Sequence, residues 1–434
     1  MTPGKRLVCA LVAAAAVSAS AGGGVPPPLI RTLDNGLTVV TQKEASSAIT
    51  VLEILIKGGL RSDPPGREGL SYATTRLSMD IPDIGKVQDF MAKALHYSMT
   101  VRSDASVIRL ECLTEFFDEM LGTFVEILTD PLINNIRLDR VKEAMAHQRR
   151  IESDDAVTVG RQAQRERFFP GTGYAGSIYG TEASLKEVKV REAKDRYERS
   201  FTAGNMVLIA VSNLDEAEMQ DLLARRFKKL RPKPGQLMPA GTGPAAPGPP
   251  GESPRVIEKE TQQNFIGAAF ALPSATPRRL VLSFLLETIL GRGPGSRIWS
   301  LRSEQKLAYN VGAAATPMKE AGLLEAFLET SPEKSAEARA ALADILREFS
   351  EKGVSAEELE AGKTELVSFF LRTNERKSSR AATLSLFESI GLGAGFFASF
   401  ADELAAVTVD ETNAFIRAYL KPEAASWVIV GPKK

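Results

Sequence analysis

Residues 58–80 read GGLRSDPPGREGLSYATTRLSMD, and the elements around this stretch are organised by it. The preceding residues, Ile49–Lys57 (ITVLEILIK), predict a mostly buried strand that ends at the Gly58-Gly59 pair. A further glycine, Gly69, comes directly before a helical pattern over residues 70–80. The stretch therefore predicts a strand, a glycine-rich turn and a helix in direct succession.

Short elements are predicted on both sides of this stretch. The turn Asp34-Asn35-Gly36 separates two β-patterned segments, 29–33 and 37–41, and is typical of a hairpin because Asn and Gly both tolerate a positive φ. Downstream, the apolar periodicity predicts further elements in this order: helix 84–94, strands 95–100 and 106–113, helices 114–129, 136–153, 159–169 and 184–201, and strand 206–211.

A proline- and glycine-rich segment divides the chain into two parts of similar length. Residues 232–254 (PKPGQLMPAGTGPAAPGPPGESP) have no apolar face and predict an extended linker. We therefore expect an N-terminal domain over residues 29–231 and a C-terminal domain over residues 255–434.

The two parts end in the same way. Tyr197 and Phe201 lead into an apolar strand, and Phe415 and Tyr419 lead into another. A matching order of helix, aromatic pair and buried strand indicates an internal duplication, although two ordinary helix–strand endings remain an alternative. The predicted fold class is α+β, with two homologous domains that form a clam-like half. Each domain is expected to be a mixed or antiparallel sheet covered on one side by helices.

The composition argues against several classes of function. The 434 residues are 44% hydrophobic and 25% charged, as in an ordinary globular protein. Lys+Arg and Asp+Glu each number 54, so no net charge draws the protein to nucleic acid or to an anionic membrane. The two histidines, His96 and His147, and the two cysteines, Cys9 and Cys112, are too few for an ordinary His- or Cys-built metal site. Packing roles are expected for His96 and Cys112, and a surface position for His147.

The first 21 residues have the pattern of a signal peptide. Lys5 and Arg6 precede the apolar run 7–17, which is shorter than the roughly 20 residues that span a bilayer. Ala19-Ser20-Ala21 fits the small-residue cleavage rule, so we expect cleavage near Ala21, a flexible tether over 22–28, and export without a stable membrane span. An uncleaved anchor, or a lipoprotein through Cys9, is the alternative.

The order of four motifs resembles the pitrilysin/insulinase-type family of zinc metallopeptidases, in particular its short two-domain subunits that work in pairs. The resemblance covers nearly all of the mature chain. Its motifs are Leu33-Asp-Asn-Gly-Leu37, Gly58-Gly59 with Gly69-Leu70-Ser71, Tyr179-Gly-Thr-Glu182, and Gly295-Ser-Arg with Leu301-Arg302 and Leu307-Ala-Tyr309.

The resemblance implies a zinc site that this chain has lost. Active relatives carry His-x-x-Glu-His on the helix after the Gly-Leu step and a further glutamate on a later helix. Here Tyr72 and Arg76 occupy the histidine positions and Thr75 that of the general base. The distant glutamate falls at Gln148, or at Glu152 if the helix register shifts. A guanidinium stays protonated and cannot bind zinc, so no metal and no catalytic residue are expected in this chain.

The resemblance also implies a substrate-binding pair that this chain keeps. Active relatives have an arginine and a tyrosine seven residues apart that hold the substrate, and Arg302 and Tyr309 have this spacing. An arginine charge and a tyrosine hydroxyl suit a developing oxyanion. The alternative is that Arg302 is a solvated helix residue and Tyr309 begins a core strand.

The resemblance implies a non-catalytic subunit of a heteromeric zinc metallopeptidase in a bacterial periplasm. A homologous partner with an intact His-x-x-Glu-His motif would hold the zinc, and unfolded peptides would be the substrate. One alternative is a peptide- or protein-binding scaffold with no role in hydrolysis. Another is an active peptidase with an unusual site, which would need zinc in the isolated chain.

Overall fold

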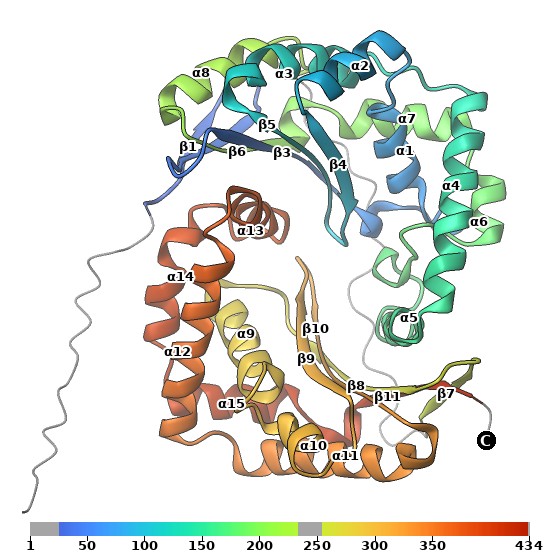
Figure 1. Cartoon of the computed structure of the whole chain (residues 1–434), viewed down its shortest axis with the longest axis vertical. Coiled ribbons are helices and arrows are strands. Elements are labelled where there is room, and N and C mark those ends of the chain that lie inside the picture. Colours follow the sequence, from blue (N-terminus) through green and yellow to red (C-terminus); the bar gives the residue numbers. More distant parts are fainter. Residues whose placement is uncertain (1–25, 233–253, 433–434) are drawn as a thin grey trace, which may run out of the picture.

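The computed structural model describes residues 26–232 and 254–432, which form two sheets with their helices (Figure 1). The predicted signal peptide (1–21), most of the tether (22–28) and nearly all of the predicted linker (232–254) lie outside the described residues. Within the described ranges, none of the helices combines the length and the apolar character that a membrane crossing requires.

The described part of the N-terminal half, residues 26–232, contains six strands and the helices between them. Their bounds are β1 Leu29–Thr32, β2 Thr38–Lys43, β3 Ile49–Lys57, η1 Leu60–Ser62, α1 Leu70–Ser78, α2 Ile84–Ala92, β4 His96–Val101, β5 Ala105–Leu113, α3 Thr114–Thr129, α4 Asn135–Asp154, α5 Ala156–Phe168, η2 Gly173–Ala175, α6 Glu182–Glu187, α7 Val190–Ser200, η3 Ala203–Asn205, β6 Met206–Ser212 and α8 Glu216–Arg226.

Residues 254–432 of the C-terminal half contain five strands. The bounds of its elements are β7 Arg255–Glu258, β8 Asn264–Leu272, α9 Pro277–Gly291, η4 Arg297–Trp299, α10 Ser300–Ser303, β9 Asn310–Pro317, β10 Gly322–Thr330, η5 Pro332–Lys334, α11 Ser335–Lys352, α12 Ala356–Thr373, α13 Lys377–Ser389, α14 Phe396–Ala405, α15 Val409–Tyr419, η6 Pro422–Ala424 and β11 Ser426–Gly431.

The two sheets repeat one topology. The N-terminal order is β1-β2-β6-β3-β5-β4 and the C-terminal order is β7-β11-β8-β10-β9. The pairs β2–β6 and β7–β11 are parallel, whereas the pairs β3–β5 and β8–β10 are antiparallel. The strands β2 to β6 therefore correspond in order to β7 to β11. The aromatic pairs before the last strands also match, with ring centroids 4.8 Å apart in Tyr197–Phe201 and 4.7 Å apart in Phe415–Tyr419.

Each sheet is covered on its inner face by a helix of the other half. Helix α13 lies against β3 and β6, and helix α5 lies against β8 and β11 (Figure 1). These two helices hold equivalent places, because each is the third α-helix after the corresponding strand, β10 or β5. The halves thus exchange one helix each.

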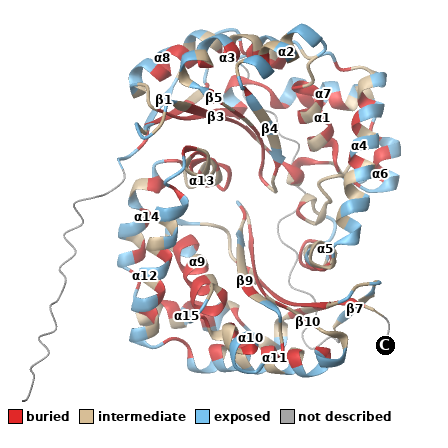
Figure 2. Cartoon of the chain, in the orientation of Figure 1, coloured by how far each residue is buried: buried red, intermediate tan, exposed pale blue. Residues whose placement is uncertain are grey.

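Strand β6 shows the consequence in its sequence. Its odd positions, Val207, Ile209 and Val211, pack in the core cluster that contains α13, and its even positions, Met206 and Leu208, pack in the core of the N-terminal half. A strand buried on both faces reads as a continuous apolar run, and every residue of β6 is buried (Figure 2).

Polar contacts also join the halves, and at two places they hold backbone groups. The buried Lys377, the first residue of α13, donates from Nζ to the carbonyls of Ser47 and Ile49 at 2.6 and 2.8 Å. At the other place, Asp104 accepts from the backbone N–H of Lys319 at 2.9 Å. These bonds fix the backbone next to each exchanged surface.

The structure confirms the predicted α+β class with two homologous, sheet-based halves, and the hairpin at Asp34-Asn35-Gly36. Two details of the prediction are wrong. The expected helix 184–201 is two helices, α6 and α7, because the chain is extended at Val188 and Lys189. The sheets are covered on both faces rather than on one side, because each receives a helix from the other half.

Glycine at position 160 allows α5 to approach β8, and its replacement tests the exchange. A Cβ at Gly160 would overlap the Phe265 ring. We expect Gly160→Ala to lower the free energy of unfolding by about 1–3 kcal/mol through overpacking, although alanine is the better helix former. Chemical denaturation with circular dichroism measures this change.

Gly122→Ala is the matched control within α3. Its Cβ would meet only the mobile end of the Arg226 side chain, with Nη1 at 2.6 Å. This variant is expected to be neutral or to gain up to about 1 kcal/mol. Equal effects of the two substitutions would contradict the close approach of α5 to β8.

Candidate functional site

Glycines at two positions set the start of α1, the helix that carries the degenerate zinc motif. Gly69 precedes the helix with φ +89°, and a Cβ there would lie 2.9 Å from the backbone nitrogen of Gly180. Gly59 has φ +51°, and its Cβ would overlap the carbonyl oxygen of Arg102. Only glycine fits such positions, so the turn brings α1 close to both the β4–β5 turn and the 171–182 loop.

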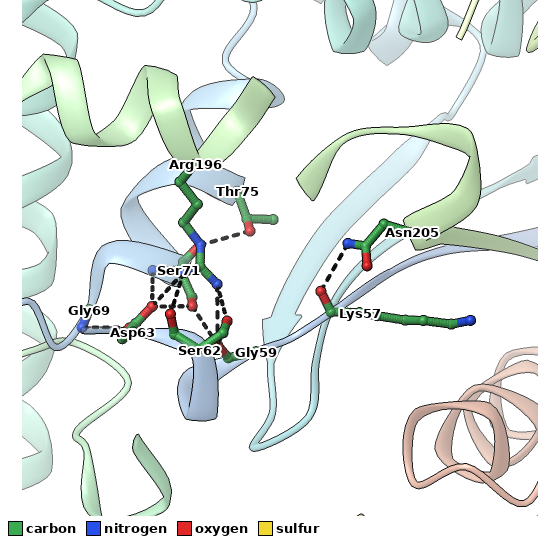
Figure 3. Close-up of polar contacts among 9 residues, drawn as sticks. All are labelled: Lys57, Gly59, Ser62, Asp63, Gly69, Ser71, Thr75, Arg196 and Asn205. Carbon is green, nitrogen blue, oxygen red and sulfur yellow. Dashed lines mark hydrogen bonds and ion pairs between the residues drawn. The ribbon is translucent and has the colours of Figure 1, made fainter. Parts of the chain in front are cut away.

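A buried carboxylate caps α1. Asp63 accepts hydrogen bonds from the backbone N–H groups of Gly69, at 3.0 Å, and Ser71, at 2.9 Å, and from the Ser71 hydroxyl (Figure 3). The cap residue, Gly69, has no side chain for this role, so Asp63 satisfies the N–H groups from outside the helix. A negative charge at a helix N-terminus also interacts favourably with the helix dipole.

Arg196 of α7 pairs with this carboxylate. Its Nη1 lies 3.1 Å from Asp63 Oδ1, and its guanidinium also donates to the carbonyls of Ser62 and Gly59 and to the Ser62 hydroxyl (Figure 3). Burial raises the pKa of Asp63 to about 6, and the neighbouring Arg196 charge and the hydrogen bonds oppose this rise. At pH 7 the carboxylate is therefore ionised and the pair is charged.

The three degenerate positions of α1 do not fit a metal. Tyr72 packs edge-on against Tyr179 with ring centroids 4.9 Å apart, and the Thr75 hydroxyl donates to the Ser71 carbonyl at 2.8 Å. Arg76 lies with Nη1 3.7 Å from Asp80 Oδ1. A phenol, a hydroxyl and a guanidinium are not the donors that zinc takes in proteins. The described residues contain no cluster of His, Cys, Asp or Glu that could hold an ion.

Two residues, Gln148 and Glu152, are candidates for the distant glutamate position, and only Glu152 has a carboxyl group. Both Gln148 and Glu152 are partly buried on α4. Burial raises the pKa of Glu152, and the Arg165 charge opposes this. Burial also raises the pKa of Tyr179, with smaller contributions from Tyr72 and Glu152. Tyr179 therefore contacts the Tyr72 ring and is close enough to Glu152 for the carboxylate charge to affect its pKa.

A cavity of about 930 Å³ adjoins this region. It lies between η1, the ends of α4 and α5, the 171–182 loop and β7, and Glu152 is part of its wall. Arg149 and Arg165 also line it, and each has one buried guanidinium nitrogen without a described partner. Tyr72, Thr75 and Arg76 are not among the lining residues, so the cavity lies beside the degenerate positions.

Arg302 and Tyr309 are neighbours in the C-terminal half. The Arg302 guanidinium carbon lies 5.7 Å from the centroid of the Tyr309 ring and 5.0 Å from that of Trp299. Tyr309 is 71% exposed. The expectation that Tyr309 begins a strand against the core does not describe its side chain, because β9 starts at Asn310 and the ring lies at the surface.

The turn between the two residues is tightly held. Lys306 has a backbone φ of +55°, which is a strained conformation for any residue other than glycine. The Leu307 N–H donates to the Leu301 carbonyl at 2.8 Å, and the Leu307 carbonyl accepts from the Thr330 hydroxyl at 2.6 Å. The Tyr309 N–H donates to the Glu329 carbonyl at 2.9 Å. These bonds fold residues 302–309 back so that the two side chains meet.

The fold does not bring the two predicted sites together. Arg302 and Tyr309 line a pocket of about 380 Å³ that shares none of its described lining residues with the larger cavity. Figure 1 shows α10, which carries Arg302, on the outer side of the C-terminal half, whereas α1 belongs to the N-terminal half. A substrate held by Arg302 and Tyr309 would therefore not lie at α1 of the same chain.

The packing role expected for His96 is wrong, because His96 begins the edge strand β4 and is exposed. His147 is exposed on α4, as expected. Cys112 is buried on β5, and burial raises the pKa of its thiol to about 11. The buried pair Asp63–Arg196 was not among the predicted residues. Its only sequence signal was an acidic residue in the turn before Gly69.

Comparisons with known proteins relate the chain to peptidase-like proteins. Residues 187–366 match the family model described as the peptidase M16 inactive domain. The chain is 26% identical over 357 residues to the non-peptidase homolog YmxG of Helicobacter pylori, which covers 81% of each protein.

Two solved structures share the fold. The peptidase M16 inactive domain from Pseudomonas fluorescens superposes with a TM-score of 0.83 and 21% identity, covering 94% of this chain and 98% of that one. A protease from Helicobacter pylori superposes with a TM-score of 0.85 and 15% identity, covering 94% and 100%. The chain is thus similar in sequence to the M16 inactive domain and to a non-peptidase homolog, and it shares the fold of M16-type proteins.

The buried pair predicts a pH effect on stability. The pKa of Asp63 is raised to about 6 in the folded chain from an ordinary 3.8, so the folded state binds a proton more readily than the unfolded state. This group alone therefore raises the free energy of unfolding as the pH falls from about 6 to about 4. Asp63→Asn removes the titration. The stability of the unaltered chain relative to this variant should rise by on the order of 3 kcal/mol between pH 7 and pH 4.

Urea denaturation of both proteins across this pH range measures the difference. Other carboxylates titrate in both proteins and cancel. A difference that stays constant or moves in the opposite direction would show that the folded pKa of Asp63 is not raised.

The donor set of α1 predicts the metal content. We expect the purified chain to contain far less than one zinc per molecule by elemental analysis. The double variant Tyr72→His/Arg76→His, which places two imidazoles one turn apart, is expected to take up zinc. Adding Glu152→Gln should lower this uptake, whereas adding Gln148→Ala should not. Stoichiometric zinc in the unaltered chain would contradict this account of α1.

Proposed function

We propose that this chain is the non-catalytic subunit of a heteromeric zinc metallopeptidase that cleaves unfolded peptides. A homologous partner carrying His-x-x-Glu-His would hold the zinc, and this chain would present Arg302 and Tyr309 to the peptide. The observation that carries the proposal is the placement of this pair. The two side chains meet in a surface pocket, apart from the degenerate positions of their own chain.

The chemistry of the pair suits a peptide bond under attack. A guanidinium supplies a fixed charge and a phenol supplies a neutral O–H donor, and both stabilise negative charge that develops on a carbonyl oxygen. Because Tyr309 is exposed, a peptide bound to a second chain can reach it. The carbonyl would lie between the two groups only when both chains are present.

The sheet edges offer a way to hold the peptide. Strands β4 and β9 are the terminal strands of their sheets in the described part of the chain, so each leaves one row of backbone groups unpaired. An extended peptide can add to such an edge through main-chain hydrogen bonds. Strand β9 follows directly on Tyr309, so a peptide beside it would pass the pocket.

The proposed location is the bacterial periplasm. The basic pair Lys5-Arg6, the apolar run 7–17 and the small residues Ala19–Ala21 support export through a cleaved signal peptide. The low cysteine count fits a chain that needs no disulfide for its stability.

A scaffold role is the second candidate. The relative YmxG carries the name non-peptidase homolog, and the same surfaces could bind peptides or proteins without any part in hydrolysis. The two candidates differ at Arg302 and Tyr309, since only the assisting role needs their polar groups.

Substitution of this pair tests the proposal. With a co-expressed partner that carries the zinc motif, Arg302→Ala is expected to lower kcat/KM for a fluorogenic peptide by about 100-fold or more, as for the loss of one oxyanion donor. Tyr309→Phe should lower it less, because only the hydroxyl is lost. Peptide cleavage by the purified complex is the measurement.

Arg347→Ala is the matched control, because Arg347 is an exposed arginine of α11 that pairs with Asp344 outside the pocket. It should leave cleavage unchanged while complex formation, followed by size-exclusion chromatography, stays the same for all three variants. Full activity of both pocket variants would reject the assisting role. Failure of any zinc-motif partner to copurify would favour the scaffold.

A further inference from the structure

The pocket around Arg302 and Tyr309 is strongly basic. Its charged lining residues are Arg302, Lys306 and Lys334, and the other described lining residues are neutral. We call these three cations with Tyr309 the basic pocket. None of the described ion pairs involves Arg302, Lys306 or Lys334, whereas many other arginines and lysines of the chain have a carboxylate partner.

The lysines of the basic pocket are held in place by the fold. Lys334 ends η5, and its Nζ donates to the Lys306 carbonyl at 3.0 Å. Lys306 keeps its left-handed backbone because the next residue, Leu307, is buried and bonded on both sides. A strained residue kept by its surroundings is common at binding sites. In this conformation Lys306 lines the pocket together with Arg302 and Lys334.

Three glutamates, Glu304, Glu329 and Glu333, adjoin the pocket closely in sequence, and none of them is among its lining residues. A hydrogen bond from Ser331 lowers the pKa of Glu333, and the Lys334 charge contributes less. Glu333 is not among the lining residues, so the pocket interior keeps an excess of positive charge. Arg302 lies over the Trp299 and Tyr309 rings, which leaves its N–H groups available to an oxygen ligand in the plane of the guanidinium.

We propose that the basic pocket binds a carboxylate of the peptide substrate, so that Lys306 and Lys334 select peptides with an acidic group beside the residues held by Arg302 and Tyr309. This inference rests on the proposed function, since it names the substrate class of the same site. The carboxylate belongs either to an acidic side chain or to a free peptide C-terminus, because both present the same two oxygens.

Peptide binding to the isolated full chain tests the inference. Three labelled peptides share one neutral sequence: the first has a central glutamate and an amidated end, the second has glutamine there and an amidated end, and the third has glutamine and a free carboxylate. Fluorescence anisotropy gives the three dissociation constants. We expect one of the two acidic forms to bind about fivefold more tightly than the neutral form, and the preferred form identifies the source of the carboxylate. Raising the salt concentration should reduce the preference.

Substitutions then assign the preference to the lysines. Lys334→Gln and Lys306→Asn should each reduce it about two- to threefold, and asparagine is chosen at 306 because it tolerates a positive φ. Lys352→Gln is the control, because Lys352 is an exposed lysine at the far end of α11, the helix that follows η5, and pairs with Glu348 at 2.8 Å. It should bind all three peptides as the unaltered chain does.

The outcomes separate this inference from the proposed function. Equal binding of all three peptides, no measurable binding of any, or an unchanged preference in both lysine variants overturns the basic pocket as a carboxylate site. In that case Arg302→Ala can still abolish cleavage in the complex. If instead the lysine variants lose the preference while Arg302→Ala complexes stay active, the carboxylate site stands and the assisting role falls.

Discussion

Helices α5 and α13 each cover a sheet that belongs to the other half of the chain, and the rest of the structure depends on this exchange. Strand β6 is apolar on both faces, so the N-terminal sheet without α13 would expose Val207, Ile209 and Val211 to water. The same holds for Phe265 and Val428 of the C-terminal sheet without α5. Neither half completes its own core, and the relative position of the two sheets follows from the packing of the exchanged helices.

The network around Asp63 secures the start of α1, and the three positions that correspond by resemblance to a zinc motif lie outside this network. Asp63, Arg196 and Ser71 secure the start of the helix, whereas Tyr72, Thr75 and Arg76 take part in other contacts. Removing one partner of a buried ion pair typically costs about 3–5 kcal/mol, so these residues are constrained by folding. Tyr72, Thr75 and Arg76 are free of that constraint, and they take part in a ring contact, a hydrogen bond and an ion pair.

Local patterns predicted most elements but not how they meet. Residue periodicity and turn chemistry predicted the strand 49–57, the hairpin at Asn35-Gly36 and the aromatic pairs near the end of each half. All of these appear in the structure. The exchange of α5 and α13 joins residues far apart in sequence, which no local period records. Arg196 lies among other charged residues of α7, so its burial had no local signal. The spacing of Arg302 and Tyr309 came from a family resemblance. Their contact depends on the positive φ of Lys306, which a lysine gives no reason to expect.

The duplication allows the two halves to be compared directly. Two halves with one topology start with equivalent surfaces, yet here the N-terminal half has a degenerate motif on α1 and the C-terminal half has an exposed Arg–Tyr pair with unpaired lysines around it. The charge of an unpaired cation cluster is unfavourable for the folded chain alone, because like charges repel at close range. The bonds of the buried Leu307 hold the backbone of Lys306 in this conformation, but none of the described ion pairs offsets the repulsion among Lys306, Arg302 and Lys334. A negatively charged ligand of the kind proposed above would offset this repulsion when it is bound.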